Sequence, residues 1–256
     1  MQHLIIDNIA IAVHISPSFD ATKKTLVFLH DSLGCIELWR DFPEQLAQLT
    51  NCNAIVYDRQ GYGKSDPAII DSRDRDYLTK EAHTLFKILN SLHLKSCILF
   101  GHSDGGSIAL LAAAIYPNTF EAIITEGAHV FVEDKTLDGI IRAKQAYKTT
   151  SLKSKLEKYH GSKTNSVFKL WTETWLSKDF KKWDITGYLK KIQCPTLVIQ
   201  GYDDEYGTEH QVMAIINMHP LQNAEAYMIP KTGHSPHKEC PELVLLKVQQ
   251  FISKIS

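Results

Sequence analysis

The pentapeptide GHSDG at residues 101–105 constrains the fold of this chain more than any other feature of its sequence. An apolar run, Ser96–Phe100, precedes it, and a run of small and apolar residues, Ser107–Ala114, follows it. This order is typical of a strand, a sharp turn and a helix. Glycines on both sides of the turn let backbone segments approach where a Cβ atom would clash. The arrangement predicts a nucleophile elbow, which lifts the hydroxyl of Ser103 above a sheet edge at a helix N-terminus.

The composition is that of an ordinary globular protein with a sizeable core. Of the 256 residues, 44% are hydrophobic, which is enough for one large α/β domain or two small ones. The formal net charge of −1 gives no sign of a nucleic-acid or membrane partner. Lysines near 153–158 and at 181–182 are interpreted as solvated helix faces. We expect a small-molecule partner and a monomer or a homodimer.

Cysteine usage and the N-terminal residues bear on the cellular compartment. The five cysteines are odd in number, widely spaced and without a C-x-x-C motif, which favours free thiols in a reducing compartment. Residues 1–7 show neither a basic region nor a long apolar stretch, and no apolar run approaches transmembrane length. The sequence therefore predicts a cytoplasmic protein.

Short apolar segments alternate with helical patterns along most of the chain. Strands are expected at 4–6, 9–15, 25–29, 53–57, 96–100, 120–125, 196–200 and 224–229. Helices are expected at 36–49, 74–92, 242–255 and directly after Ser103. Strands that alternate with helices predict an α/β fold with a mostly parallel, doubly wound sheet.

Residues 131–192 interrupt this alternation. They show four consecutive helical patterns and no strand, at 137–147, 151–159, 165–175 and 180–189. Three of the four tryptophans fall here, namely Trp171, Trp175 and Trp183. We predict a core domain, 1–130 with 193–256, and a helical cap, 131–192, over a site at the carboxyl edge of the sheet. The alternative is that these aromatic residues only anchor a small helical subdomain.

A serine nucleophile needs a base, and the base needs an acid that orients it. The loop 201–205 follows the strand 196–200 and carries Asp203 and Asp204, while His234 follows the strand 224–229. Carboxyl ends of parallel strands meet at one edge, so these loops are expected near Ser103. Position alone leaves both aspartates open. His237 is a second histidine of the same region, and we interpret it as a capping or surface group.

Together these motifs resemble the α/β-hydrolase superfamily over essentially the whole chain. In that family the acid lies three residues after the glycine that ends its strand, which implies Asp204, and the base follows Thr-Gly or a similar pair, which implies His234. Asp203 is then interpreted as a turn residue. The chain more closely resembles an uncharacterised bacterial group of cap-bearing hydrolases, through segments 30–34, 101–106, 107–110, 129–134, 200–208 and 233–237.

The resemblance also implies an oxyanion hole of two backbone N–H groups. One donor is the residue after the nucleophile, Asp104, and the other lies in the loop His30–Gly34, at Ser32. Asp31 stands where the family usually has glycine, so we expect its carboxylate to point away from a developing oxyanion. The stretch DRQGYGKS at 58–65 matches the family's D-x-x-G-x-G-x-S loop, whose role is mainly architectural.

These residues predict acyl transfer to water without a cofactor or a metal. Ser103 attacks a carbonyl group, His234 takes and returns the proton, and Asp204 orients His234. A serine nucleophile argues against the dehalogenase and epoxide hydrolase branches, in which a carboxylate attacks. A small ester or related acyl substrate is expected. Alternatives on the same triad are C–C bond hydrolysis, a cofactor-free oxygenase or perhydrolase, and a non-catalytic protein that binds a small ligand.

Substrate contacts are expected from residues near the cap. Glu126 and His129 follow the strand 120–125 at the active edge, and Tyr206 follows the acid. Our hypothesis is that Glu126 faces the pocket and contacts a polar or cationic part of the substrate. The alternative is that Glu126 pairs with a Lys or Arg of the cap. Trp171 and Trp175 are further candidate contacts from the cap.

Overall fold

A single eight-stranded sheet organises the computed structural model, which describes residues 1–255. The strands are β1 (Gln2–Ile6), β2 (Ile9–Ile15), β3 (Thr25–Leu29), β4 (Asn53–Tyr57), β5 (Cys97–His102), β6 (Phe120–Glu126), β7 (Thr196–Gly201) and β8 (Ala224–Ile229). Their order is β1-β2-β4-β3-β5-β6-β7-β8, and the pairs from β4 to β8 are all parallel. The predicted α/β class and mostly parallel sheet are confirmed.

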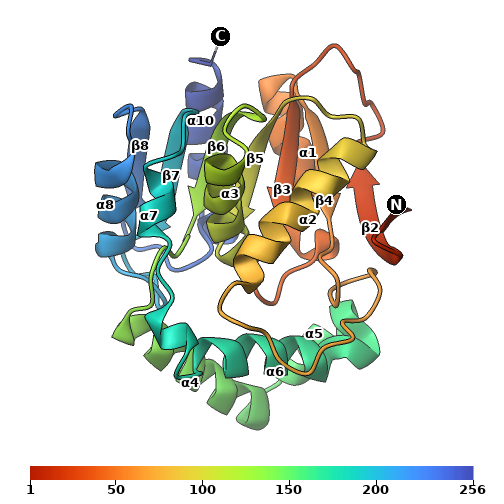
Figure 1. Cartoon of the computed structure of the whole chain (residues 1–256), viewed down its shortest axis with the longest axis vertical. Coiled ribbons are helices and arrows are strands. Elements are labelled where there is room, and N and C mark those ends of the chain that lie inside the picture. The colour runs from red at the N-terminus through yellow and green to blue at the C-terminus, as the bar shows by residue number, and fades with distance from the viewer. Residues whose placement is uncertain (256) are drawn as a thin grey trace.

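Helices cover both faces of this sheet (Figure 1). They are η1 (Ile36–Trp39), α1 (Phe42–Thr50), α2 (Tyr77–Ser91), α3 (Asp104–Ile115), α4 (Asp134–Thr149), α5 (Leu152–His160), η2 (Gly161–Lys163), α6 (Thr164–Trp175), η3 (Phe180–Lys182), α7 (Thr186–Leu189), α8 (Glu209–Met218), α9 (Pro236–Glu239) and α10 (Pro241–Ile252). Successive residues of a strand face opposite sides, so Val27 joins the core under α2 and α3 while Phe28 joins the core under α1 and α10.

The single helix predicted over 36–49 is broken in the structure. A short 3₁₀ turn, η1, ends at Trp39, and Arg40 then takes a left-handed φ of 53° before α1 begins at Phe42. Pro43 explains the break, because proline lacks an N–H group and fits only the first turn of a helix. Helix α8 was not predicted, although its buried Val212 and Ile215 are spaced as on one helix face.

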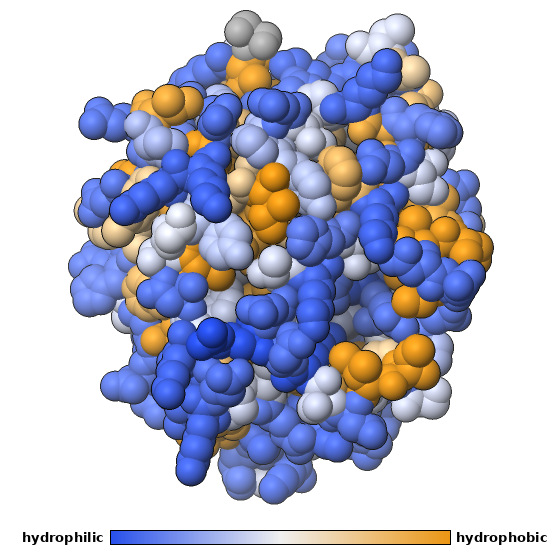
Figure 2. Space-filling view, in the orientation of Figure 1, coloured by the Kyte–Doolittle hydropathy of each residue, from blue (hydrophilic) through white to orange (hydrophobic). Residues whose placement is uncertain are grey.

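The segment between β6 and β7 is helical, as predicted. Figure 1 shows α4, α5 and α6 as a layer at one end of the sheet. An isolated antiparallel bridge between Phe131 and Asp184 joins the beginning of this helical segment to its end. No helix within residues 1–255 has the length and apolar character needed to cross a bilayer. All five cysteines are free thiols. On the face shown in Figure 2, hydrophobic residues lie in separate patches on a mostly hydrophilic surface.

Two side chains at the α5–α6 corner fasten the helical segment to the core. His160 accepts a hydrogen bond from the Gly63 N–H at Nδ1 (3.1 Å), so its other nitrogen, Nε2, donates to the Leu33 carbonyl (2.9 Å). The Nζ of Lys163 donates to the three backbone carbonyls of Tyr62, Gly63 and Ser65. Both contacts end on loops at the carboxyl edge of the sheet, so they fix the helical segment over that edge.

We expect Lys163→Met to lower the free energy of unfolding by about 1–2 kcal/mol, because three carbonyls lose a charged donor. Urea denaturation followed by circular dichroism measures this difference. Lys155→Met is the matched control, since Lys155 is exposed on the same helical segment. Equal stability of the two variants would show that the Lys163 contacts do not hold the segment in place.

Candidate active site

Ser103 lies on a strained turn between β5 and α3. Its φ of 55° and ψ of −119° fall outside the regions that residues with a Cβ atom normally adopt. The flanking glycines explain how the turn is held. A Cβ at Gly101 would lie 2.2 Å from the Gly105 carbonyl oxygen, and a Cβ at Gly105 would lie 2.0 Å from that of Leu29. The motif therefore requires glycine at both positions.

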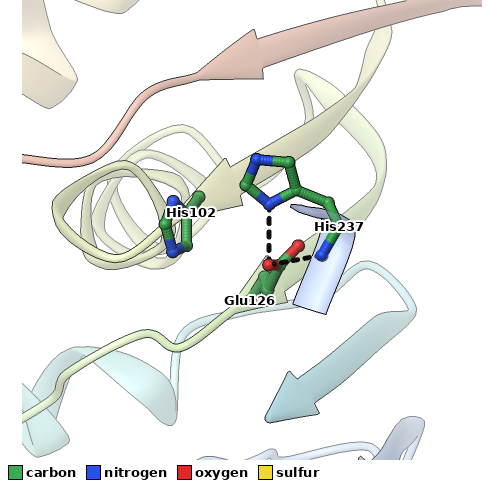
Figure 3. A group of neighbouring side chains, drawn as sticks. All are labelled: His102, Glu126 and His237. Carbon is green, nitrogen blue, oxygen red and sulfur yellow. Dashed lines mark hydrogen bonds and ion pairs between the residues drawn. The ribbon is translucent and has the colours of Figure 1, made fainter. Parts of the chain in front are cut away.

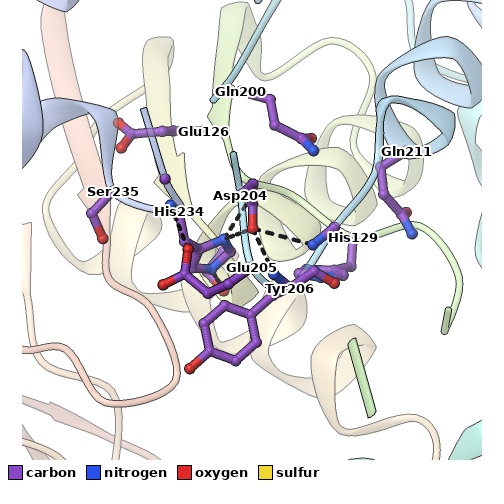
Figure 4. A network of polar contacts seen from close by, with 12 residues as sticks. Glu126, His129, Gln200, Asp204, Glu205, Tyr206, Gln211, His234 and Ser235 are labelled. Carbon is purple, nitrogen blue, oxygen red and sulfur yellow. Dashed lines mark hydrogen bonds and ion pairs between the residues drawn. The ribbon is translucent and has the colours of Figure 1, made fainter. Parts of the chain in front are cut away.

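Three side chains from separate loops form one chain of hydrogen bonds. Figure 4 shows the part of it between Asp204 and His234. The Nε2 of His234 lies 2.9 Å from the Oγ of Ser103. The Nδ1 of His234 lies 2.9 Å from each carboxylate oxygen of Asp204. An ionised carboxylate only accepts hydrogen bonds, so Nδ1 carries the proton and Nε2 is free to accept one from Ser103. Asp203 is exposed and takes no part in this chain.

Burial and hydrogen bonding set the charge of this group. Burial raises the pKa of Asp204, but the charge and hydrogen bond of His234 and the Tyr206 N–H outweigh it and lower the pKa to about 2. Burial lowers the pKa of His234, but the charge and hydrogen bond of Asp204, helped by the charges of Glu205 and Asp31, outweigh that effect and raise it above its usual range. Asp204 is thus a fixed anion that holds His234 in one tautomer and favours its protonated form.

The two predicted oxyanion donors lie beside Ser103. Asp104 is the first residue of α3, where a backbone N–H has no partner within the helix. Ser32 lines the same cavity as Ser103. The Asp31 carboxylate accepts the Leu33 N–H at Oδ1 (2.9 Å), and its Oδ2 lies 3.4 Å from Nδ1 of His102. Asp31 also lines the cavity, so its charge contributes to the electrostatic environment there.

A cavity of about 220 Å³ opens in front of Ser103 and His234. Four of the five residues predicted to contact substrate line it, namely His129, Trp171, Trp175 and Tyr206. A hydrogen bond between the Nε2 of His129 and the carbonyl oxygen of Tyr206 (3.2 Å) fixes the His129 ring. Sequence reasoning missed Thr136 and Ile140 of α4, which also line the cavity. The helical segment therefore supplies much of the cavity wall.

The prediction that Glu126 faces the pocket is wrong, and so is the alternative of a Lys or Arg partner from the cap. Glu126 is fully buried, and its Oε1 accepts hydrogen bonds from the backbone N–H (3.0 Å) and the Nδ1 (2.8 Å) of His237 (Figure 3). His237 is not a surface group either, because its ring is buried against Trp39 and Phe42. The contact between residues 111 positions apart has no local sequence signal.

His102, Glu126 and His237 also form a compact group of side chains of metal-ligand type, with one donor atom of each within 4.8 Å of the others. Most of their polar contacts are made within this group and with nearby loops, whereas Oε2 of Glu126 is buried without a hydrogen-bond partner within residues 1–255. The Nε2 of His102 lies 2.8 Å from the His234 carbonyl oxygen, and the Nδ1 of His237 bonds Glu126. Burial raises the pKa of Glu126, but the His237 charge and hydrogen bonds outweigh it and lower the pKa. The group therefore supports the loop that carries His234.

Comparison with known proteins defines the class. The family model described as serine aminopeptidase, S33, matches residues 20–173. The chain is 28% identical over 226 residues to mouse serine hydrolase BPHL, covering 83% of this chain and 74% of that protein. It is 26% identical over 242 residues to a 2-hydroxy-6-oxononadienedioate/2-hydroxy-6-oxononatrienedioate hydrolase of Paraburkholderia phymatum, covering 84% of this chain and 82% of that protein.

Solved structures share the fold. The α/β hydrolase MGS-M2, from a deep-sea metagenome library, has a TM-score of 0.80 at 20% identity and covers 98% of this chain and 97% of its own. The meta-cleavage product hydrolase CumD of Pseudomonas fluorescens also has a TM-score of 0.80, at 15% identity, over 100% of this chain and 98% of its own. The fold is that of the α/β hydrolases, as predicted. The chain belongs to the serine aminopeptidase S33 family of that superfamily and is a hydrolase.

Proposed function

We propose that this protein hydrolyses a small ester or related acyl substrate through an acyl-enzyme intermediate. The observation that carries the proposal is the hydrogen-bonded chain from Asp204 through His234 to Ser103, open to a cavity at its serine end. An arrangement of this kind makes a serine hydroxyl nucleophilic at neutral pH. The relatives named as serine hydrolases support the same reaction class.

The mechanism follows from the geometry. As the Oγ of Ser103 attacks the substrate carbonyl, Nε2 of His234 accepts the hydroxyl proton and then returns it to the leaving group. Asp204 stabilises the protonated imidazole. The N–H groups of Ser32 and Asp104 bind the oxyanion, each contributing roughly 3 kcal/mol to transition-state stabilisation. Water then enters, is deprotonated by His234, and releases the acid.

The helical segment would act as a cap. We place the boundary at residues 131 and 192, next to the Phe131–Asp184 bridge and β7. Because Trp171 and Trp175 form part of the cavity wall, this cap would select the size and shape of the acyl group. Its aromatic residues also pack against the core, as the ring of Trp175 does against His129 (centroids 5.3 Å apart). The cap would thus combine the two roles that the sequence left open, which are covering the site and anchoring a helical subdomain to the core.

The cavity's charge favours an ester over an anionic C–C hydrolase substrate. Asp31 and Glu205 line it, and no Lys or Arg within residues 1–255 does. Burial raises the pKa of Asp31, but hydrogen bonding to His102 and the nearby charges outweigh it and hold the pKa well below its usual range. An anionic substrate would meet like charges there. The hydrolases of similar fold include one named for a dienoate, which is an anion.

The central test replaces the nucleophile. Ser103→Ala should reduce turnover of 4-nitrophenyl acetate by at least about 10³-fold, because the acyl-enzyme cannot form. The same variant should lose covalent labelling by a fluorophosphonate, read by mass spectrometry. Wild-type labelling without multiple turnover on any acyl ester would instead favour a ligand-binding role, and turnover that requires oxygen or peroxide would favour an oxygenase or perhydrolase.

The pH dependence of kcat/KM should report His234. Only the neutral imidazole accepts the serine proton, and Asp204 raises the pKa of His234, so kcat/KM should fall as pH drops through an apparent pKa above 6.5. Asp204→Asn removes the charge that raises this pKa. The acidic limb should then move to lower pH, and kcat should fall on the order of 10³-fold or more. If the acidic limb of the kcat/KM profile does not move in Asp204→Asn, a group other than His234 is responsible for it.

Substrate charge is tested with phenyl esters of β-alanine, butyric acid and succinic acid, which differ in a terminal ammonium, methyl or carboxylate group. We expect kcat/KM for the succinyl ester to be about tenfold or more below that for the butyryl ester, because of repulsion by Asp31 and Glu205. Glu205→Gln should narrow this ratio, whereas Glu126→Gln should leave it unchanged, since Glu126 lies outside the cavity. Preference for the succinyl ester would contradict the proposal that the cavity disfavours anionic substrates.

A further inference from the structure

Arg59 joins the two loops that carry the oxyanion donors. Its side chain is 1% exposed and lies between the loop after β3 and the first turn of α3. One guanidinium nitrogen, Nη2, donates a hydrogen bond to the Asp31 carbonyl (2.8 Å). Nη1 and Nη2 also lie 3.4 and 3.5 Å from Oδ2 of Asp104. One buried cation therefore touches a residue of each loop.

His30 reinforces the contact to Asp31. The backbone N–H of Arg59 donates to Nε2 of His30 (3.0 Å), so that nitrogen carries no proton and Nδ1–H donates to the Asp31 carbonyl (2.7 Å). Burial and the Arg59 charge hold the pKa of His30 well below its usual range, which keeps the ring neutral and this tautomer fixed. The Asp31 carbonyl thus accepts a hydrogen bond from each of these two side chains, and a third, longer one from the Gly34 N–H of its own turn (3.3 Å).

The orientation of that carbonyl decides where the Ser32 N–H points. The Asp31 carbonyl and the Ser32 N–H belong to one peptide unit, and in a trans peptide they point in opposite directions. Arg59 and His30, together with the Gly34 N–H, hold the carbonyl on one side, so the N–H is directed to the other side. Ser32 lines the cavity with Ser103, and its N–H donates to no protein acceptor within residues 1–255. The N–H is left for a ligand.

The second donor is held through its side chain. Asp104 is 1% exposed, and its Oδ2 also accepts the Tyr77 hydroxyl (3.0 Å), which in turn accepts Nε1–H of Trp175 (2.9 Å). These bonds fix the first residue of α3, whose own N–H is the donor next to the nucleophile. Within residues 1–255, Arg59 is the side chain whose hydrogen bonds and ion pair reach both Asp31 and Asp104.

We propose that Arg59 is a positioning residue of the oxyanion hole, which sets the distance and direction of the Ser32 and Asp104 N–H groups together. The inference rests on the proposed function, because it needs an oxyanion to form at Ser103. Lysine can keep the buried charge, but it lacks the planar guanidinium that reaches two acceptors at once. Arg59→Lys should therefore no longer position the Ser32 and Asp104 N–H groups together.

The test separates transition-state from ground-state effects. Arg59→Lys should lower kcat for 4-nitrophenyl acetate by about tenfold or more, with KM within about twofold of wild type. The affinity for phenylboronic acid, which forms a tetrahedral adduct with the serine, should fall by a similar factor. In Arg59→Ala, added guanidinium should restore part of kcat. Should Arg59→Ala fail to fold, Arg59→Lys decides the result by itself.

Arg73→Lys is the matched control, since Arg73 lies over the same Tyr62 ring as Arg59 and contacts neither oxyanion loop. Its kcat and boronate affinity should stay within about twofold of wild type. The proposal is overturned if Arg59→Lys changes only the melting temperature, or if kcat falls while boronate affinity does not. Absence of Ser103-dependent turnover in the wild-type protein would be a different result, which refutes the proposed function itself.

Discussion

The close approach of β3, β5 and α3 is the constraint on which the rest of the site depends. Ser103 keeps a left-handed φ of 55° because Gly101 and Gly105 bring three backbone segments into contact. A Cβ at Gly105 would lie 2.0 Å from the Leu29 carbonyl oxygen at the end of β3. The same contact therefore strains the turn at Ser103, the proposed nucleophile, and brings the loop that follows β3 beside the first turn of α3. The proposed oxyanion donors, the N–H groups of Ser32 and Asp104, lie in these two segments.

Three hydrogen-bonded pairs of buried ionisable side chains lie around this contact, and each pair holds a different loop. Asp204 holds His234, the proposed base, and Arg59 joins the loop after β3 to the first turn of α3. Glu126 holds His237, three residues beyond the base. A buried charge without a partner would be strongly destabilising, so each pair resists movement of the loops it joins. Two carboxylates, Asp31 and Glu205, line the cavity, and no Lys or Arg within residues 1–255 lines it with them.

Local sequence patterns predicted the elements that have local causes. Continuous apolar runs gave the buried strands, and the expected strand Ala224–Ile229 agrees with β8 at both ends. The elbow and the loops of Asp204 and His234 follow from strand order, because parallel strands share one carboxyl edge. The helix over 36–49 was predicted without regard to Pro43, whose missing N–H is a local cause that the apolar periodicity masks.

The sequence by itself determined the fold class, the strained serine turn and the order of the three reactive side chains, since spacing and residue type along the chain fix all of them. Only the tertiary structure decided which polar groups pair. Glu126 meets His237 across 111 positions, and Arg59 meets Asp104 across 45. A side chain's partner depends on its direction from the sheet and on the packing around it. The direction of a side chain from the sheet follows from strand alternation within one element. The packing around it depends on contacts between elements that are distant in the sequence.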